Sequence, residues 1–335
     1  ITQTGADISW TPSPQSVGGS GYEYEVRTSG TPGSGSTGLV KAGTSGTLSA
    51  IITGLSPNTD YFVYIRSNCG STTVSRWSLV PLEFKTLCGV TTGFYENFDT
   101  TPTGTSSVNN FPTCWSFIDE VVTSGYGYVN ASNPQSGSNS YRLYKTNTTT
   151  NVGQSIILIS PTTDNLGNGT KQVRFSARAG LATNINSLEI VSLNNNSATP
   201  TATLITTINV TGISYVEHIV SLPVTTDDYF GFRLVHHGGT AISTVHLDDI
   251  YYEDTPPPTL VTSHTDILCN AAATGTATVE VTGGALPLTY SWSPSGGTAA
   301  TATGLVAGTY TVTVTDGLNR TVTGSVTITE PTAVV

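Results

Sequence analysis

Apolar and polar residues alternate along most of the chain, which is the pattern of strands that bury one face. Tyr22, Tyr24 and Val26 alternate with charged residues in the first third. Val312 and Val314 alternate with threonines near the end. No stretch of ten or more residues shows a helical period built from helix-forming residues. The pattern therefore predicts an all-β protein.

The middle of the chain carries strand patterns at short intervals, the spacing of a two-sheet jelly roll. These predicted strands are residues 126–129, 141–144, 155–159, 172–177, 187–192, 215–220 and 229–234. Two further alternating stretches, residues 94–99 and 241–254, lie about 150 residues apart. A β-sandwich often brings its chain ends together by pairing its first and last strands. We therefore expect these two stretches to pair.

This pairing would set Glu96 and Asp99 close to Asp248 and Asp249. Four carboxylates in one place repel each other unless a cation lies among them, and hard oxygen ligands suit Ca²⁺. The hypothesis is a structural calcium site; the alternative is an acidic strand end exposed to solvent. Strand alternation puts Asp248 and Asp249 on opposite faces, so we expect one of them to face the metal, with backbone carbonyls completing the site.

The length of 335 residues and the breaks in the strand pattern predict three domains. The boundaries fall at Cys88 and at the run Pro256-Pro257-Pro258, a short semi-rigid spacer. The predicted domains are residues 1–87, 88–254 and 255–335. The chain contains no Met and opens and stops abruptly, so we expect it to be an internal piece of a longer protein.

The formal net charge of −10 argues against a nucleic-acid partner, because little here could neutralise a run of phosphates. No apolar run approaches 18 residues, so no membrane insertion is expected. The low charged content and the abundance of Thr, Ser and Gly fit an extracellular surface. The expected location is extracellular, at the cell surface.

The four cysteines show no zinc-type spacing, and this composition favours an oxidising compartment. The predicted strands place Cys69 and Cys88 at opposite tips, roughly 23 Å apart. A disulfide needs Cα atoms within about 7 Å. Cys88 with Cys114 is therefore the predicted disulfide, and Cys69 and Cys269 are left single.

The first block resembles a known module in the run GLSPNTDYFVYIR, which begins at Gly54. Leu55, Pro57, Thr59 and Tyr61 fall at the spacing of the fibronectin type III signature. The resemblance implies a small β-sandwich in which Tyr61 forms the tyrosine corner and Trp10 fills the core. Such modules are mostly spacers.

The second block resembles the MAM-like jelly rolls of secreted bacterial adhesins, a group that includes cleaved-adhesin domains. The matching residues are Glu96, Phe98, Asp99, Cys114-Trp115, Ser160-Pro161 and Asp248-Asp249-Ile250. In relatives with a metal, the opening acid and the closing aspartates line a structural calcium site. The concave face of such a fold could stack sugars on aromatic rings, or those rings could form the core. The aromatic residues on offer are Trp115, Tyr126, Tyr128, Tyr141 and Tyr144.

The third block resembles the SprB-type repeat, a PKD-like (Ig-like) sandwich found in tandem in gliding adhesins. The matching residues are Cys269-Asn270, Gly283-Gly284, Pro287, Tyr290-Ser291-Trp292, Gly308-Thr309-Tyr310 and Asp316. The chain departs from the family after Asn270, where it reads AAATG. The final residues EPTAVV are expected to link to a following repeat.

No catalytic constellation is found: the sequence has no HExxH, no GxSxG, no P-loop and no Rossmann fingerprint. The acid pairs Asp119-Glu120 and Asp227-Asp228 are poorly placed for a glycosidase. The resemblances imply a non-catalytic segment of a secreted surface adhesin from gliding, type IX-secreting bacteria, which binds a polysaccharide or surface ligand. The alternatives are an ancillary binding segment of a secreted hydrolase or peptidase, and filament material without a ligand.

Overall fold

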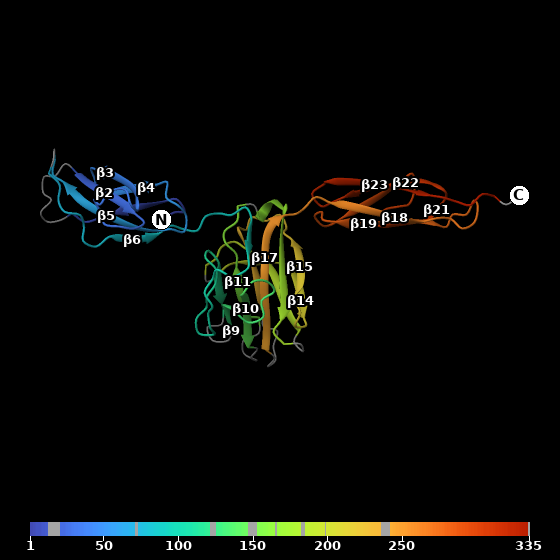
Figure 1. Cartoon of the computed structure of the whole chain (residues 1–335), viewed down its shortest axis with the longest axis horizontal. Helices are drawn as coiled ribbons and strands as arrows, with labels where there is room; N and C mark the ends of the chain where they lie inside the picture. Colours follow the sequence, from blue (N-terminus) through green and yellow to red (C-terminus); the bar gives the residue numbers. More distant parts are fainter. Residues whose placement is uncertain are drawn as a thin grey trace. The chain divides into compact units, whose positions relative to one another are not determined.

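The computed structural model describes residues 1–12, 21–70, 73–120, 125–146, 153–164, 166–181, 185–197, 199–235 and 242–333. Within these ranges the regular structure is strand, apart from a 3-10 turn at Leu166–Asn168, so the predicted all-β class is confirmed. The chain divides into two compact units, Ile1–Val90 and Thr91–Val335 (Figure 1). The described residues contain no helix long and apolar enough to cross a membrane.

The first unit has two small sheets. One pairs β1 (Gly5–Ser9) with β4 (Ser49–Thr53), and the other has the order β3 (Leu39–Ser45), β2 (Gly21–Arg27), β5 (Asp60–Asn68), β6 (Leu82–Lys85). Tyr61 is buried in the core, and its hydroxyl accepts a hydrogen bond from Ser56 N at 2.8 Å. Trp10 is only partly buried and packs edge-on against Tyr22, at 5.4 Å between ring centroids.

The second unit begins with a sandwich of two larger sheets around one core. One sheet has the order β15 (Val216–Ser221), β12 (Lys171–Ala179), β17 (Ile242–Asp254), β10 (Ser140–Thr146), β9 (Gly125–Asn130), and β7 (Phe94–Glu96) also pairs with β17. The other has the order β14 (Ala202–Thr211), β13 (Ile185–Leu193), β16 (Tyr229–Val235), β11 (Ser155–Ile159), β8 (Ser116–Asp119). Figure 1 shows the long β17 running through the middle of this sandwich.

Alternation located most of these strands, with two omissions and one overrun. β8 and β14 were not predicted. The strand predicted over residues 94–99 ends at Glu96, because Phe98 has a left-handed φ of 61° that turns the chain and buries its ring in the core. The last predicted strand matches β17, except that Ala241 lies outside the described residues.

The end of the chain forms a third pair of sheets with its own core. One sheet has the order β18 (Thr259–Thr265), β19 (Gly275–Thr282), β21 (Thr301–Leu305). The other has the order β20 (Thr289–Ser293), β22 (Gly308–Thr315), β23 (Thr321–Ile328). Trp292, Tyr310 and Val312 lie in this core, which is a separate cluster from that of the preceding sandwich. The three prolines lie between β17 and β18. The domain boundaries drawn from the sequence stay a prediction.

Candidate functional site

The predicted pairing of the first and last strands of the central sandwich is confirmed. β7 runs antiparallel to β17, with Glu96 opposite Ile250 and Tyr95 opposite Tyr251. The rings of Tyr95 and Tyr251 stack with centroids 4.4 Å apart. This pairing carries Glu96 towards the middle of β17, where the two aspartates lie.

Asp99, Asp248 and Asp249 meet at the 131–139 loop, which joins β9 to β10, whereas Glu96 Oε1 accepts a hydrogen bond from Phe98 N at 2.6 Å. Asp248 is completely buried, and its Oδ2 accepts hydrogen bonds from Gln135 N at 2.7 Å and Ser136 N at 3.3 Å. Asp99 Oδ1 accepts hydrogen bonds from Ser138 N at 2.7 Å and Asn139 N at 3.0 Å. The carboxylates therefore hold the loop through its backbone amides, a strong kind of hydrogen bond because the acceptor is charged.

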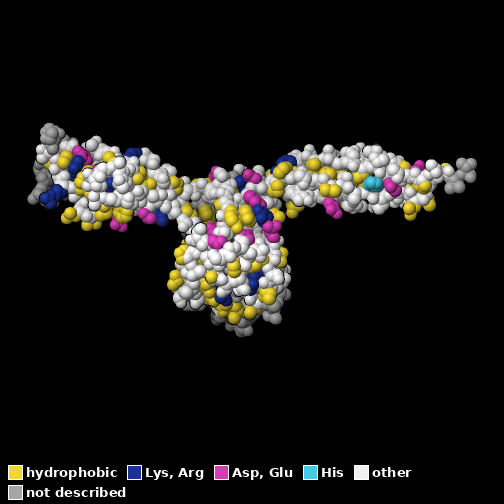
Figure 2. Space-filling model, in the orientation of Figure 1, with side chains coloured by type: hydrophobic (Ala, Val, Ile, Leu, Met, Phe, Trp, Pro, Cys, Tyr) yellow, Lys and Arg dark blue, Asp and Glu magenta, His cyan; other side chains and the backbone are white. Residues whose placement is uncertain are grey.

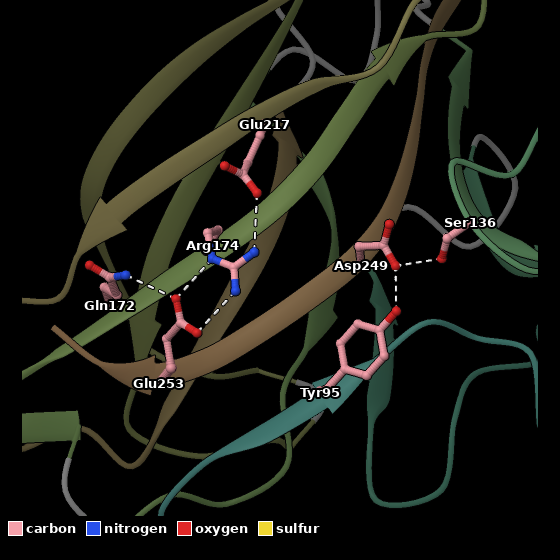
Figure 3. Close-up of polar contacts among 7 residues, drawn as sticks. All are labelled: Tyr95, Ser136, Gln172, Arg174, Glu217, Asp249 and Glu253. Atoms are coloured by element: carbon pink, nitrogen blue, oxygen red, sulfur yellow. Dashed lines mark hydrogen bonds and ion pairs between the residues drawn. The ribbon is translucent and has the colours of Figure 1, made fainter. Parts of the chain in front are cut away.

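Asp248 and Asp249 both reach this loop, contrary to the alternation expected of a strand. Asp249 Oδ1 accepts hydrogen bonds from Ser136 Oγ at 2.6 Å and from Tyr95 Oη at 2.5 Å (Figure 3). The pairing of β12 with β17 shifts register between Arg174 and Ser176, and Asp249 has a left-handed φ of 48°. This bulge breaks the period of two, so consecutive aspartates contact one serine.

The electrostatics of the cluster follow from its burial. Burial raises the pKa of Glu96, and the charges of Asp248 and Asp99 raise it further. Burial likewise raises the pKa of Asp248 to about 6. The amide of Ser138 lowers the pKa of Asp99. In the part of the chain that the structure describes, no three His, Cys, Asp or Glu side chains come together as a group able to hold a metal ion.

The structure contains one disulfide bond. Cys88 and Cys114 are the disulfide-bonded cysteines, while Cys69 and Cys269 are free and exposed. Both free thiols lie on the surface, so neither is the buried, inert cysteine that often remains in a β-sandwich.

A second polar cluster, which sequence reasoning missed, lies further along β12 and β17. Arg174 donates to Glu253 at 2.9 Å and to Glu217 at 3.1 Å (Figure 3). Its guanidinium also lies 3.8 Å from the ring centroid of Tyr251. The partners are 43 and 79 residues away in sequence, so no local signal reveals them. The cluster ties β15, β12 and β17 together.

The structure separates the five aromatic residues considered for sugar stacking. Trp115 and Tyr141 are buried in the core, which is the second of the two alternatives drawn from the sequence. Tyr126, Tyr128 and Tyr144 lie instead on the outer side of β9 and β10 and are partly exposed. Tyr126 and Tyr144 stack with centroids 4.4 Å apart and planes within 5°.

The acid pairs weighed as catalytic residues hold neighbouring strands. Glu120 Oε2 accepts hydrogen bonds from the amide and the hydroxyl of Ser155, at 2.7 and 2.8 Å. Asp227 Oδ2 accepts one from Ser192 Oγ at 2.5 Å. Glu120 thus holds Ser155 at the start of β11, and Asp227 holds Ser192 near the end of β13.

Comparison with known proteins gives one family match and several similar folds. The model of the SprB repeat family matches residues 261–297, which confirms part of the resemblance seen in the third block. A search of curated proteins finds no match.

Among solved structures, the K2 cleaved adhesin domain of Lys-gingipain is 17% identical with a TM-score of 0.38, covering 48% of this chain and 99% of that one. The K1 domain from Porphyromonas gingivalis W83 is 18% identical with a TM-score of 0.37, covering 50% and 100%. The CBM22-1 xylan-binding domain of Paenibacillus barcinonensis Xyn10C is 9% identical with a TM-score of 0.33, covering 50% and 97%.

Proposed function

We propose that the chain is a non-catalytic binding segment of a large secreted cell-surface adhesin, of the kind carried by gliding, type IX-secreting bacteria. The observation that carries the proposal is the SprB repeat match at residues 261–297. The match covers strands β18 and β19 and continues through Trp292 in the core of the last sandwich. The fibronectin type III and MAM-like assignments of the other blocks belong to the same proposal.

The construction of the chain supports this role. The described residues of the first, central and last parts of the chain have hydrophobic clusters of their own, each between its own sheets, and the central sandwich carries a second, smaller cluster. A series of β-sandwiches lengthens a protein and leaves sheet faces and loops open for ligands. Charged side chains are few and scattered on the face drawn in Figure 2, so most of that surface offers hydroxyl, amide and apolar groups. A disulfide fits an oxidising, extracellular location.

The calcium hypothesis is part of the proposal. Glu96, Asp99, Asp248 and Asp249 supply only oxygen donors, which suits Ca²⁺. Burial and neighbouring carboxylates raise the pKa values of Glu96 and Asp248, and a bound cation would offset the repulsion between these charges. A bound calcium ion would fix the 131–139 loop against β17. We expect calcium to raise the melting temperature and EDTA to reverse the rise; no shift in either direction would contradict the site.

Binding of the purified chain to immobilised glycans and host-surface proteins tests the function. We expect saturable binding to at least one surface polysaccharide or protein. Absence of binding across the panel, together with ordered self-association, would favour filament material instead. The sequence flanking this chain separates the remaining alternative: further repeats support an adhesin, and an adjoining catalytic domain supports an ancillary module of a hydrolase.

A further inference from the structure

The outer face of the six-stranded sheet carries a row of basic residues across three neighbouring strands. Arg142 of β10 lies opposite His246 of β17, and His246 lies opposite Arg178 of β12. Residues opposite each other in antiparallel strands point to the same face. Because two strand spacings separate the arginines, their Cα atoms lie about 10 Å apart.

These two arginines differ from most others in the chain, because no carboxylate neutralises them. Ion pairs with Asp or Glu are formed by Arg27, Arg66, Arg174, Arg233 and Arg320. Within the described residues neither Arg142 nor Arg178 makes one. None of the residues outside the described ranges is an Asp or Glu, so those segments bring no carboxylate either.

The acids that share this sheet face are already engaged. Glu217 and Glu253 bind Arg174 (Figure 3). Arg174 lies four residues before Arg178 on β12, and both side chains point to the same face of the sheet. Asp248 accepts its hydrogen bonds from the 131–139 loop. Arg142 and Arg178 therefore form no ion pair with these acids, and each keeps its positive charge on this face.

The guanidinium groups retain hydrogen-bonding capacity. Arg142 donates one side-chain hydrogen bond within the described residues, from Nη1 to Tyr128 Oη at 3.3 Å. Arg178 donates from Nε to the carbonyl of Ala179 at 3.2 Å. Burial, together with the charges of Arg178 and Arg142, lowers the pKa of His246 to about 4.

Aromatic rings lie on both sides of the row. Arg142 lies 5.3 Å from the ring centroid of Tyr144, which stacks on Tyr126. Arg178 lies 5.9 Å from the ring centroid of Tyr215. Partly exposed tyrosines offer a ring and a hydroxyl to a saccharide, and the planar guanidinium fork matches a carboxylate.

We propose that the sheet face between Arg142 and Arg178 binds a carboxylate-bearing saccharide, an acidic polysaccharide of the uronic acid class. The carboxylate pairs with the arginines, and the tyrosines beside Arg142 contact the sugar rings. The proposal rests on the proposed function, because it names the ligand class of the binding segment. It commits to a sugar because the cations are bordered by tyrosines rather than by further Lys or Arg.

Calorimetric titration of the whole chain in EDTA with short oligogalacturonates tests the proposal. The methyl-esterified oligomers, which carry no charge, serve as the control ligand. Arg142→Gln and Arg178→Gln, singly and together, are compared with Arg76→Gln. Arg76 is exposed, unpaired and in the first unit, so the control makes the same change of charge. Unchanged melting temperatures show that the variants fold.

We expect the acidic oligomers to bind, the esterified ones to bind at least tenfold more weakly, and each arginine variant to lose about tenfold or more in affinity. Arg76→Gln should bind like the wild type. Unchanged affinity in the double variant overturns the proposal. Tighter binding of polyglutamate than of oligogalacturonate at these arginines also overturns the proposal. Binding of neutral glycans alone also overturns it but leaves the adhesin function standing, whereas failure to bind any glycan or surface protein removes both.

Discussion

Asp316 is the residue on which the last sandwich is expected to depend most. Its Oδ1 accepts hydrogen bonds from Leu318 N at 3.0 Å and Arg320 N at 2.9 Å. Its Oδ2 accepts them from Ala285 N at 3.1 Å and Arg320 Nε at 2.8 Å. The carboxylate is fully buried, while Arg320 is 34% exposed and also donates to the carbonyls of Thr255 and Pro256.

Asp316→Asn keeps the shape of this side chain but replaces one acceptor oxygen with a donor. Two of the four hydrogen bonds lose their acceptor, and the ion pair with Arg320 disappears. Breaking a buried pair from one side costs about 3–5 kcal/mol. Because Arg320 is partly in water and keeps two carbonyl partners, we expect the lower end, about 3 kcal/mol.

Hydrogen exchange of the whole chain measures this loss where it occurs. A loss of about 3 kcal/mol corresponds to roughly a hundredfold faster exchange in β22 and β23. The strands of the central sandwich serve as an internal reference. Glu280→Gln, an exposed change of the same charge on β19, should leave β22 and β23 unchanged. An acceleration below about threefold in Asp316→Asn would refute the reasoning.

The same residue sets a pH dependence. Burial alone would raise the pKa of Asp316, but the hydrogen bonds from Arg320, Ala285 and Leu318 outweigh it and lower the pKa below its ordinary 3.8. A lowered pKa stabilises the fold above the ordinary value, and this stabilisation is lost as pH falls through the folded value. We therefore expect the melting temperature of the wild type to converge on that of Asp316→Asn as the pH drops below about 4. A constant gap down to pH 2 would contradict the assignment.

Three further changes give separate tests. Lys145 is fully buried, its Nζ has no hydrogen-bond partner among the described residues, and burial lowers its pKa. Lys145→Met should therefore raise the free energy of unfolding by about 1–3 kcal/mol in urea titrations, and the difference from the wild type should shrink towards pH 10. An equal or lower stability of the variant would contradict this. Tyr61→Phe removes the acceptor of Ser56 N and should cost about 1 kcal/mol in the first unit's thermal transition, and no cost would show that this hydrogen bond adds nothing. Asp248→Asn should abolish any rise in melting temperature caused by calcium, measured against the same variant in EDTA, and a surviving calcium effect would exclude Asp248 as a ligand.

Alternation along the chain was sufficient for the strand class and for most strand positions. β11 occupies residues 155–159 as predicted, because a short run of branched apolar residues favours a strand whichever face is buried. β14 was missed because its residues, ATLITTINVT, mix polar and apolar side chains without a clean period. The pairing of the strand that holds Glu96 with β17 was also predictable, since it follows from the closure of a sandwich by its end strands.

Other features depended on the tertiary structure alone. The sequence shows that Tyr141 and Tyr144 face opposite ways, but only packing decides that Tyr141 enters the core. The contact of both Asp248 and Asp249 with Ser136 requires a bulge that no local pattern announces. Periodicity tells which residues share a face of one strand, whereas the register between distant strands, and so every site built across a sheet, is fixed by the packing of the whole sandwich.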